Sequence, residues 1–286
     1  MNDSKIARVF GPRGRPVAVV GQGSWRADEA DAAEAIRALR RGLDLGLTHI
    51  DTAEMYGSGA AETLVGAAIE GRRDEVFLVS KVLPGNASRR GTILACEKSL
   101  ARLKTDRLDC YLLHWRGSYP LEETVGAFEM LARDGKIRSW GVSNFDVDDL
   151  DEVGKIAGPG HPTCNQVLYH LRERAIEHRV IPWCSARGIA VVAYTPFGET
   201  PGLFAADHAE GQVLQDIAAA HGATARQVAL AFLLRLPNLF VIPKAANVNH
   251  VADNAGAASL HLNEAELACI DAAFPRGTAR RGLPMI

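Results

Sequence analysis

Short apolar runs alternate with longer amphipathic stretches along nearly the whole chain, and this alternation limits the folds that the chain can adopt. The short runs predict β-strands, while apolar residues spaced by three or four positions predict helices between them. Parallel strands that helices cover on both faces are apolar throughout, as these runs are. The predicted strands cover residues 17–20, 49–51, 76–81, 108–114, 137–143, 163–167, 189–194 and 239–243.

Eight strand–helix units in a row predict an α/β fold, a closed (β/α)8 TIM barrel in which residues 1–286 form a single domain. A doubly wound open sheet is the alternative for the same alternation. Residues 9–17 read as a turn between two short strands, so we expect an N-terminal β-hairpin that plugs the barrel. The predicted helices, the last followed by a short basic tail, cover residues 28–45, 60–70, 88–103, 121–133, 146–157, 176–187, 213–221, 225–235, 248–257 and 264–273.

Charge, hydropathy and cysteine content exclude several classes of function. The net charge of -2 provides no attraction to nucleic acid or to an anionic membrane. No apolar run approaches the ~20 residues that span a bilayer, and residues 1–6 lack the apolar segment of a signal peptide. The five cysteines form no CxxC pair, which predicts buried, reduced thiols and no metal site. We therefore expect a cytoplasmic protein, and a monomer because no long exposed apolar stretch stands out.

Ionisable residues stand at the ends of three consecutive predicted strands. The second ends in Asp51, the third in Lys81 and the fourth in His114, and Tyr56 follows Asp51 by five residues. In a (β/α)8 barrel, the C-terminal ends of the strands surround the mouth where active sites lie. Each residue alone has an ordinary structural explanation, such as a turn cap or a core histidine. Their shared position at one rim predicts that all four meet in one pocket.

An acid, a phenol, an amine and an imidazole in one pocket can protonate a carbonyl oxygen. The barrel interior is apolar, so the buried charges of Asp51 and Lys81 would have to neutralise each other. A tyrosine beside Lys81 would gain a lower pKa and become a better proton donor near neutral pH. His114 could then orient a carbonyl oxygen against the phenol of Tyr56. Lys81 as a Schiff-base nucleophile, as in barrel aldolases, is an alternative that needs no nicotinamide.

Seven short segments, in order along the chain within residues 21–254, resemble the aldo-keto reductases. They are residues 51–57 (DTAEMYG), 80–82 (SKV), 112–115 (LLHW), 141–145 (GVSNF), 165–167 (NQV), 193–196 (AYTP) and 242–244 (IPK). The short form of the chain is similar to the bacterial branch of methylglyoxal and aldehyde reductases. The resemblance implies Tyr56 as general acid, Lys81 and Asp51 as the pair that tunes its pKa, and His114 as the residue that orients the carbonyl. It also implies NADPH as the hydride source and a small-molecule aldehyde or ketone as the substrate.

The chain lacks the Rossmann fingerprint for dinucleotide binding, because Arg26 stands where the third glycine would be. The expected cofactor site therefore rests on the resemblance to the family alone. In the family, Tyr194 would stack on the nicotinamide ring and Lys244 would pair with the 2′-phosphate. Ala245 and His250 replace a usual Ser or Thr and a usual Arg, and a neutral His binds phosphate less strongly, so NADH use is also expected. The implied cofactor residues are Gly23, Ser24, Trp25, Ser143, Asn144, Gln166, Tyr194, Thr195, Pro196, Lys244, His250 and Asn254.

The substrate side of the pocket is predicted to be aromatic. The resemblance places Trp25 and Trp115 there, with Met55 and Phe197 as further candidates. Arg116 and the arginines of the tail could favour carboxylated substrates, although solvated surface arginines are the more ordinary interpretation. A non-catalytic, NADPH-binding redox-sensing subunit stays an alternative function. The sequence does not identify the physiological carbonyl compound.

Overall fold

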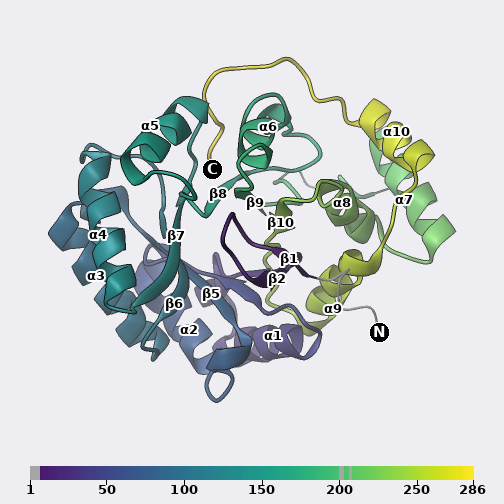
Figure 1. Ribbon diagram of the computed structural model, residues 1–286. Coiled ribbons are helices and arrows are strands. Elements are labelled where there is room, and N and C mark those ends of the chain that lie inside the picture. The colour runs from purple at the N-terminus through teal and green to yellow at the C-terminus, as the bar shows by residue number, and fades with distance from the viewer. Residues whose placement is uncertain (1–6, 200–202, 206–207) are drawn as a thin grey trace.

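The computed structural model describes residues 7–199, 203–205 and 208–286. The six N-terminal residues, on which the expectation about a signal peptide depends, lie outside this part. Eight parallel strands form one sheet whose spatial order follows the chain (Figure 1). They are β3 (Gln22–Gly23), β4 (His49–Asp51), β5 (Phe77–Val82), β6 (Leu108–Leu113), β7 (Ile137–Ser143), β8 (Cys164–Leu168), β9 (Ala190–Tyr194) and β10 (Leu239–Val241).

The sheet closes on itself between its first and last strands. Val20 and Gly23 form parallel bridges to Val241 and Lys244, and the Gly21 N–H donates to the Val241 carbonyl at 2.8 Å. Closure satisfies the backbone groups that the two edge strands would otherwise leave unpaired. The (β/α)8 barrel expected from the sequence is therefore confirmed, and the open doubly wound sheet is excluded.

The N-terminal hairpin is also confirmed, with one correction. β1 (Ala7–Val9) pairs antiparallel with β2 (Pro16–Ala18), so residues 17 and 18 belong to the hairpin, and the first barrel strand begins only at Gln22. An apolar run of four residues cannot tell a hairpin strand from a barrel strand. Phe10, which follows β1 and is 1% exposed, packs its ring against His49 and Phe240, so the hairpin seals the barrel floor.

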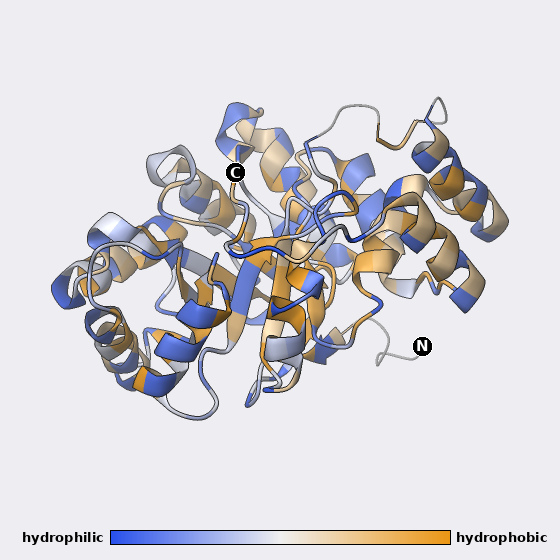
Figure 2. Cartoon of the chain, turned by 90° about the horizontal axis from the view of Figure 1, so that it is seen from above, coloured by the Kyte–Doolittle hydropathy of each residue, from blue (hydrophilic) through white to orange (hydrophobic). Residues whose placement is uncertain are grey.

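Helices surround the barrel, and Figure 2 shows hydrophobic residues along most of the central strands. α1 packs beside both α2 and α9, which closes the outer layer as the sheet closes the inner one. Within the described residues, no helix is long and apolar enough to cross a bilayer. The helices are α1 (Ala32–Asp44), α2 (Ala60–Ala68), α3 (Arg89–Leu103), α4 (Leu121–Arg133), α5 (Val147–Ala157), α6 (Val180–Ser185), α7 (Ala209–His221), α8 (Ala225–Leu233), α9 (Val248–Gly256) and α10 (Glu264–Ala273).

Two predicted helices start too early. α1 begins at Ala32 because the Asp31 side chain accepts the Glu34 N–H and caps the helix there. The helix predicted at 176–187 is only the six residues of α6. Pro182 has no N–H to donate four residues back, so an α-helix cannot run through it from residue 176, and it lies in the first turn instead. Asp146 does cap α5, as expected, by accepting the Val147 N–H.

The thiol prediction holds for four of the five cysteines. Cys96, Cys110, Cys164 and Cys184 are buried, but Cys269 on α10 is exposed. α10 is a peripheral helix that packs on α7, and the chain after it runs along the edge of the molecule to a C-terminus beside α6 (Figure 1). The last two residues, Met285 and Ile286, line the pocket at the mouth of the barrel.

Candidate active site

One buried lysine connects the acid and the phenol at the barrel mouth. Lys81, on β5, is completely buried, and its Nζ donates to Asp51 Oδ1 at 2.5 Å, to the Thr52 carbonyl at 2.9 Å and to Tyr56 Oη at 3.1 Å. Asp51 ends the neighbouring strand β4, so pairing of the two strands brings the two side chains to the same rim. These three acceptors use all three donors of the ammonium group.

Tyr56 reaches the rim through a tight turn. It begins the short 3-10 helix η3 (Tyr56–Gly59), in which Gly57 and Ser58 both adopt left-handed conformations, with φ of 55° and 52°. This turn folds the chain back toward β5, so that the Lys81 ammonium also lies 4.8 Å from the centre of the Tyr56 ring. The conformation is rare for a serine, and it shows that the turn is held by its surroundings.

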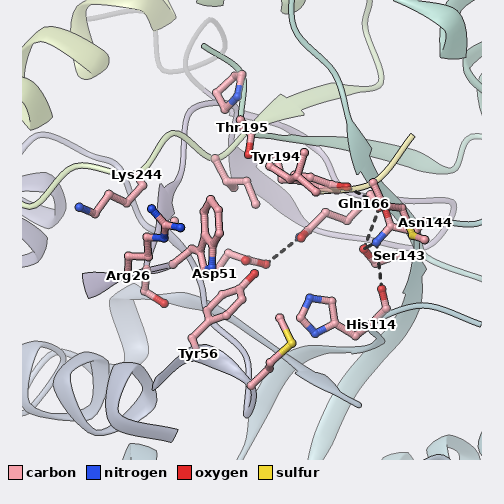
Figure 3. A pocket seen from close by; sticks show the side chains of 18 of the residues that line it. Arg26, Asp51, Tyr56, His114, Ser143, Asn144, Gln166, Tyr194, Thr195 and Lys244 are labelled. Atoms are coloured by element: carbon pink, nitrogen blue, oxygen red, sulfur yellow. Dashed lines mark hydrogen bonds between the residues drawn. The ribbon is translucent and has the colours of Figure 1, made fainter. Parts of the chain in front are cut away.

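His114 approaches Tyr56 from the other side. It directly follows β6, and its N–H donates to the Val82 carbonyl at 3.0 Å, which extends the ladder with β5. The rings of Tyr56 and His114 meet edge to face with their centres 5.8 Å apart. Figure 3 shows both side chains pointing into one pocket. The structure thus brings together all four residues at the strand ends.

The electrostatics of the cluster differ from the expectation in one respect. Burial disfavours the Lys81 ammonium, but Asp51 and Tyr56 outweigh it and raise the pKa of this amine, so it is charged at neutral pH. Burial raises the pKa of the Tyr56 phenol above its ordinary value, and Lys81 offsets only part of that rise. The predicted net lowering of the Tyr56 pKa is therefore wrong for this structure, because desolvation exceeds the attraction of the ammonium.

His114 is a neutral imidazole. Burial, and secondly the charge of Lys81, lower its pKa to about 2, so the ring carries no charge at any ordinary pH. A neutral imidazole can still donate a hydrogen bond to a carbonyl oxygen. Together, a protonated phenol and a neutral imidazole form a site with two hydrogen-bond donors for one oxygen.

A hydrogen-bonded chain of polar residues from β7 to β9 adjoins the cluster. Gln166 Nε2 donates to Asp51 Oδ2 at 2.7 Å, and the Gln166 carbonyl accepts from Ser143 Oγ at 2.9 Å. Asn144 Nδ2 donates to the His114 carbonyl at 3.1 Å, and Tyr194 Oη donates to Asn144 Oδ1 at 2.9 Å. Gln166 and Asn144 are therefore bonded directly to the cluster, and Ser143 and Tyr194 are bonded to it through them.

A pocket of about 580 Å³ is lined by both groups of residues except Lys81, which lies buried beneath it. Arg26 and Lys244 lie at one end of it, and His114 and Asn144 lie at the other (Figure 3). Ser24 also lines the pocket, and its buried Oγ has no partner among the described residues. Of the other residues predicted to bind cofactor or substrate, the lining includes Gly23, Trp25, Trp115, Thr195 and Pro196.

The model of the Aldo/keto reductase family matches residues 19–274. The chain belongs to this family. It is therefore an oxidoreductase, and its barrel is the fold of solved aldo/keto reductases. The aldo/keto reductase of Klebsiella pneumoniae, solved in complex with NADP and acetate, superimposes with a TM-score of 0.91 at 44% identity, over 98% of this chain and 99% of that one.

Two sequence relatives are named for the small carbonyl compounds methylglyoxal and glyoxal. The methylglyoxal reductase YeaE of Escherichia coli is 47% identical over 270 residues, which cover 93% of this chain and 94% of the relative. The glyoxal reductase of Bacillus subtilis is 35% identical, over 84% and 83% of the two chains. Both relatives align over most of their length, so the similarity extends well beyond the residues of the pocket.

Some predicted contacts of this aldo/keto reductase lie elsewhere. Arg116 is engaged by Glu152 at 2.7 Å and Asp149 at 3.2 Å, so it is a paired surface arginine rather than a free carboxylate receptor. His250 and Asn254 are on α9, beyond the described lining of the pocket, and their contact with adenine and phosphate stays a prediction. Met55 and Phe197 do line the pocket, as suggested.

Sequence reasoning missed six lining residues, which are Arg26, Gly198, Glu199, Ile242, Met285 and Ile286. Arg26 has a left-handed backbone with φ of 57°, and its guanidinium lies 4.6 Å from the centre of the Trp25 ring. Its position one residue after Trp25, which was predicted to line the pocket, could have indicated that Arg26 lines the pocket as well. Met285 and Ile286 also line the pocket. The tail that carries them is fixed by the Gly282 N–H, which donates to Asp146 Oδ2 at 3.0 Å, and this tertiary contact leaves no mark in local sequence.

Proposed function

We propose that this protein reduces aldehydes or ketones to alcohols with NADPH. The observation that carries the proposal is the placement of Tyr56 Oη, 3.1 Å from the buried Lys81 ammonium, at the mouth of an aldo/keto reductase barrel. A carbonyl oxygen that accepts hydrogen bonds from Tyr56 and His114 would be polarised and then protonated. When bound, NADPH supplies the hydride that reduces the carbonyl carbon.

Each residue of the cluster has a distinct part in the proposed reaction. Tyr56 gives its phenolic proton to the substrate oxygen as negative charge develops there. Lys81 stabilises the phenolate that remains, because its ammonium already lies within hydrogen-bond distance. Asp51 keeps Lys81 charged, and neutral His114 orients the oxygen without competing as an acid. In the reverse direction, the same groups would accept the proton from an alcohol.

The residues of the pocket suit NADPH at both ends. The amide and hydroxyl groups of Ser143, Asn144 and Gln166 can bind a carboxamide, and the Tyr194 ring offers a face for a flat heteroaromatic ring. Arg26 and Lys244 supply positive charge for phosphate groups at the opposite end (Figure 3). Within the described chain, Lys244 has no carboxylate in ion-pair distance, so it is available to a 2′-phosphate.

The substrate we propose is a small, uncharged aldehyde, with methylglyoxal as the first candidate. Relatives named for methylglyoxal and glyoxal support this choice. Trp25, Met55 and Trp115 provide an apolar wall. Arg116 is neutralised by its carboxylate partners, so no free arginine on that loop favours a carboxylated substrate.

The Schiff-base alternative is disfavoured by the same geometry. A nucleophilic lysine must lose its proton, but Asp51 and Tyr56 raise the pKa of Lys81, and its three donors are all engaged. Such an amine has neither a free lone pair nor room to attack a carbonyl.

The direct test is the oxidation of NADPH by the purified protein with methylglyoxal and a panel of other aldehydes, with NADH measured in parallel. We expect turnover with NADPH that depends on the aldehyde, and slower turnover with NADH. Tight binding of NADPH without reduction of any carbonyl compound would contradict the proposal and favour a non-catalytic cofactor-binding subunit.

A further inference from the structure

Glu54 lies between Asp51 and Tyr56 but does not line the pocket. Its carboxylate is directed instead toward the loop that follows β5. Glu54 Oε1 accepts the backbone N–H of Leu83 at 2.7 Å and the side-chain amide of Asn86 at 3.0 Å. One carboxylate oxygen therefore links the loop that carries Tyr56 to the loop that follows Lys81.

The bond from Leu83 to Glu54 takes the place of a backbone hydrogen bond between the ends of β4 and β5. Where the ladder between β4 and β5 is regular, the Phe77 N–H donates to the carbonyl of Thr48, a spacing of 29 residues. At the same spacing, the Leu83 N–H would donate to the backbone carbonyl of Glu54. It donates instead to the side-chain carboxylate of Glu54. The Glu54 N–H still donates to the Lys81 carbonyl at 3.4 Å, so the carboxylate adds one bond to β5 beyond the last backbone bond between the two segments.

The bond to Asn86 extends the link to a third loop. Asn86 ends the 3-10 helix η5 (Pro84–Asn86), and Pro84 packs against Gly117, where an added Cβ would lie 2.6 Å from the Pro84 Cβ. Gly117 closely follows His114 and Trp115. The loops after β4, β5 and β6 are therefore linked in series, first through Glu54 and then through Pro84.

We propose that Glu54 is a positioning residue that sets the distance between Tyr56 Oη and Lys81 Nζ by accepting these two hydrogen bonds. The inference rests on the proposed function. Without the acceptor, the Leu83 N–H loses its partner, and the loop that carries Tyr56 keeps its backbone bond from the Glu54 N–H to the Lys81 carbonyl but loses its side-chain link to the residues after β5. A displacement of about 1 Å at a reacting group can reduce turnover by about a hundredfold, so the effect should appear in kcat.

Three variants separate this role from a general loss of stability. Glu54→Ala removes the acceptor, while Glu54→Gln keeps an oxygen that can accept both bonds but removes the charge. Glu123→Ala is the matched control, because the Glu123 carboxylate also accepts a backbone N–H across elements, that of Arg89 at 3.1 Å, outside the pocket. For each variant we would measure kcat with methylglyoxal, the Kd for NADPH and the thermal midpoint, with Tyr56→Phe alongside.

The expected result is a kcat at least about tenfold lower in Glu54→Ala, with NADPH affinity within twofold of the wild type. Glu54→Gln should recover most of that loss, and Glu123→Ala should keep full kcat even if it melts earlier. The inference is overturned if Glu54→Ala keeps wild-type kcat, if Glu54→Gln is as slow as Glu54→Ala, or if kcat follows the thermal midpoint in all variants. If Tyr56→Phe stays active, the proposed function fails instead.

Discussion

Lys81 Nζ lies 3.1 Å from Tyr56 Oη and 2.5 Å from Asp51 Oδ1, so a single buried ammonium serves both the phenol and the carboxylate. The carboxylate keeps the amine charged, and the charged amine stabilises a phenolate when the phenol gives up its proton. The structure and chemistry of the site therefore depend on the same contact. Changing either neighbour of Lys81 should have a different and measurable consequence.

Replacing Asp51 by Asn should destabilise the protein strongly. The change leaves the Lys81 charge fully buried without its counter-ion, and removing one partner of a buried pair costs about 3–5 kcal/mol. Unfolding in urea would measure this loss. The control is Glu97→Gln, which breaks the solvent-exposed pair with Lys136 and should cost about 1 kcal/mol or less. Equal losses in the two variants would show that burial does not increase the contribution of the Asp51–Lys81 pair to the free energy of unfolding.

Two buried histidines should make the protein less stable in weak acid. Burial lowers the pKa of His49 to about 3 and that of His114 to about 2, whereas both take up protons near pH 6.5 once unfolded. Because the unfolded chain then binds more protons, the free energy of unfolding falls as the pH drops below 6.5. We expect a loss of about 3 kcal/mol between pH 6.5 and pH 5 from the two residues.

The variant His49→Leu checks the source of that dependence. It should lose about half of the decrease over the same interval, since one of the two titrating groups is gone. Urea unfolding at the two pH values gives the difference within each protein, so a change in absolute stability does not interfere. A pH dependence that is unchanged in His49→Leu would refute the assignment to His49.

Lys244→Ala should weaken NADPH binding selectively. A hydrogen bond to a charged group contributes about 1.5–3 kcal/mol, which corresponds to a rise in the KM for NADPH of about tenfold to a hundredfold. The KM for NADH should stay the same, because NADH has no 2′-phosphate. Lys244→Arg should retain most of the NADPH affinity. A parallel rise for both cofactors would place Lys244 outside the 2′-phosphate site.

The barrel and its four rim residues could be predicted because both follow from local order. Alternating apolar runs specify strands and crossovers, and a residue at the end of a barrel strand must lie at the mouth. The sign of the Tyr56 pKa shift could not be predicted, since it depends on whether burial or Lys81 has the larger effect. Met285 and Ile286 were missed because only a tertiary contact brings the tail back to the pocket.

The central claim is that Tyr56 donates the proton, and Tyr56→Phe tests it most directly. Phenylalanine fills the same partly buried space but has no hydroxyl group, so NADPH should bind with an unchanged Kd. Turnover of methylglyoxal should fall by at least about a hundredfold, as expected on loss of a general acid. Tyr119→Phe, which changes an exposed tyrosine, should leave turnover intact. Turnover by Tyr56→Phe within a few fold of the wild type would contradict the account.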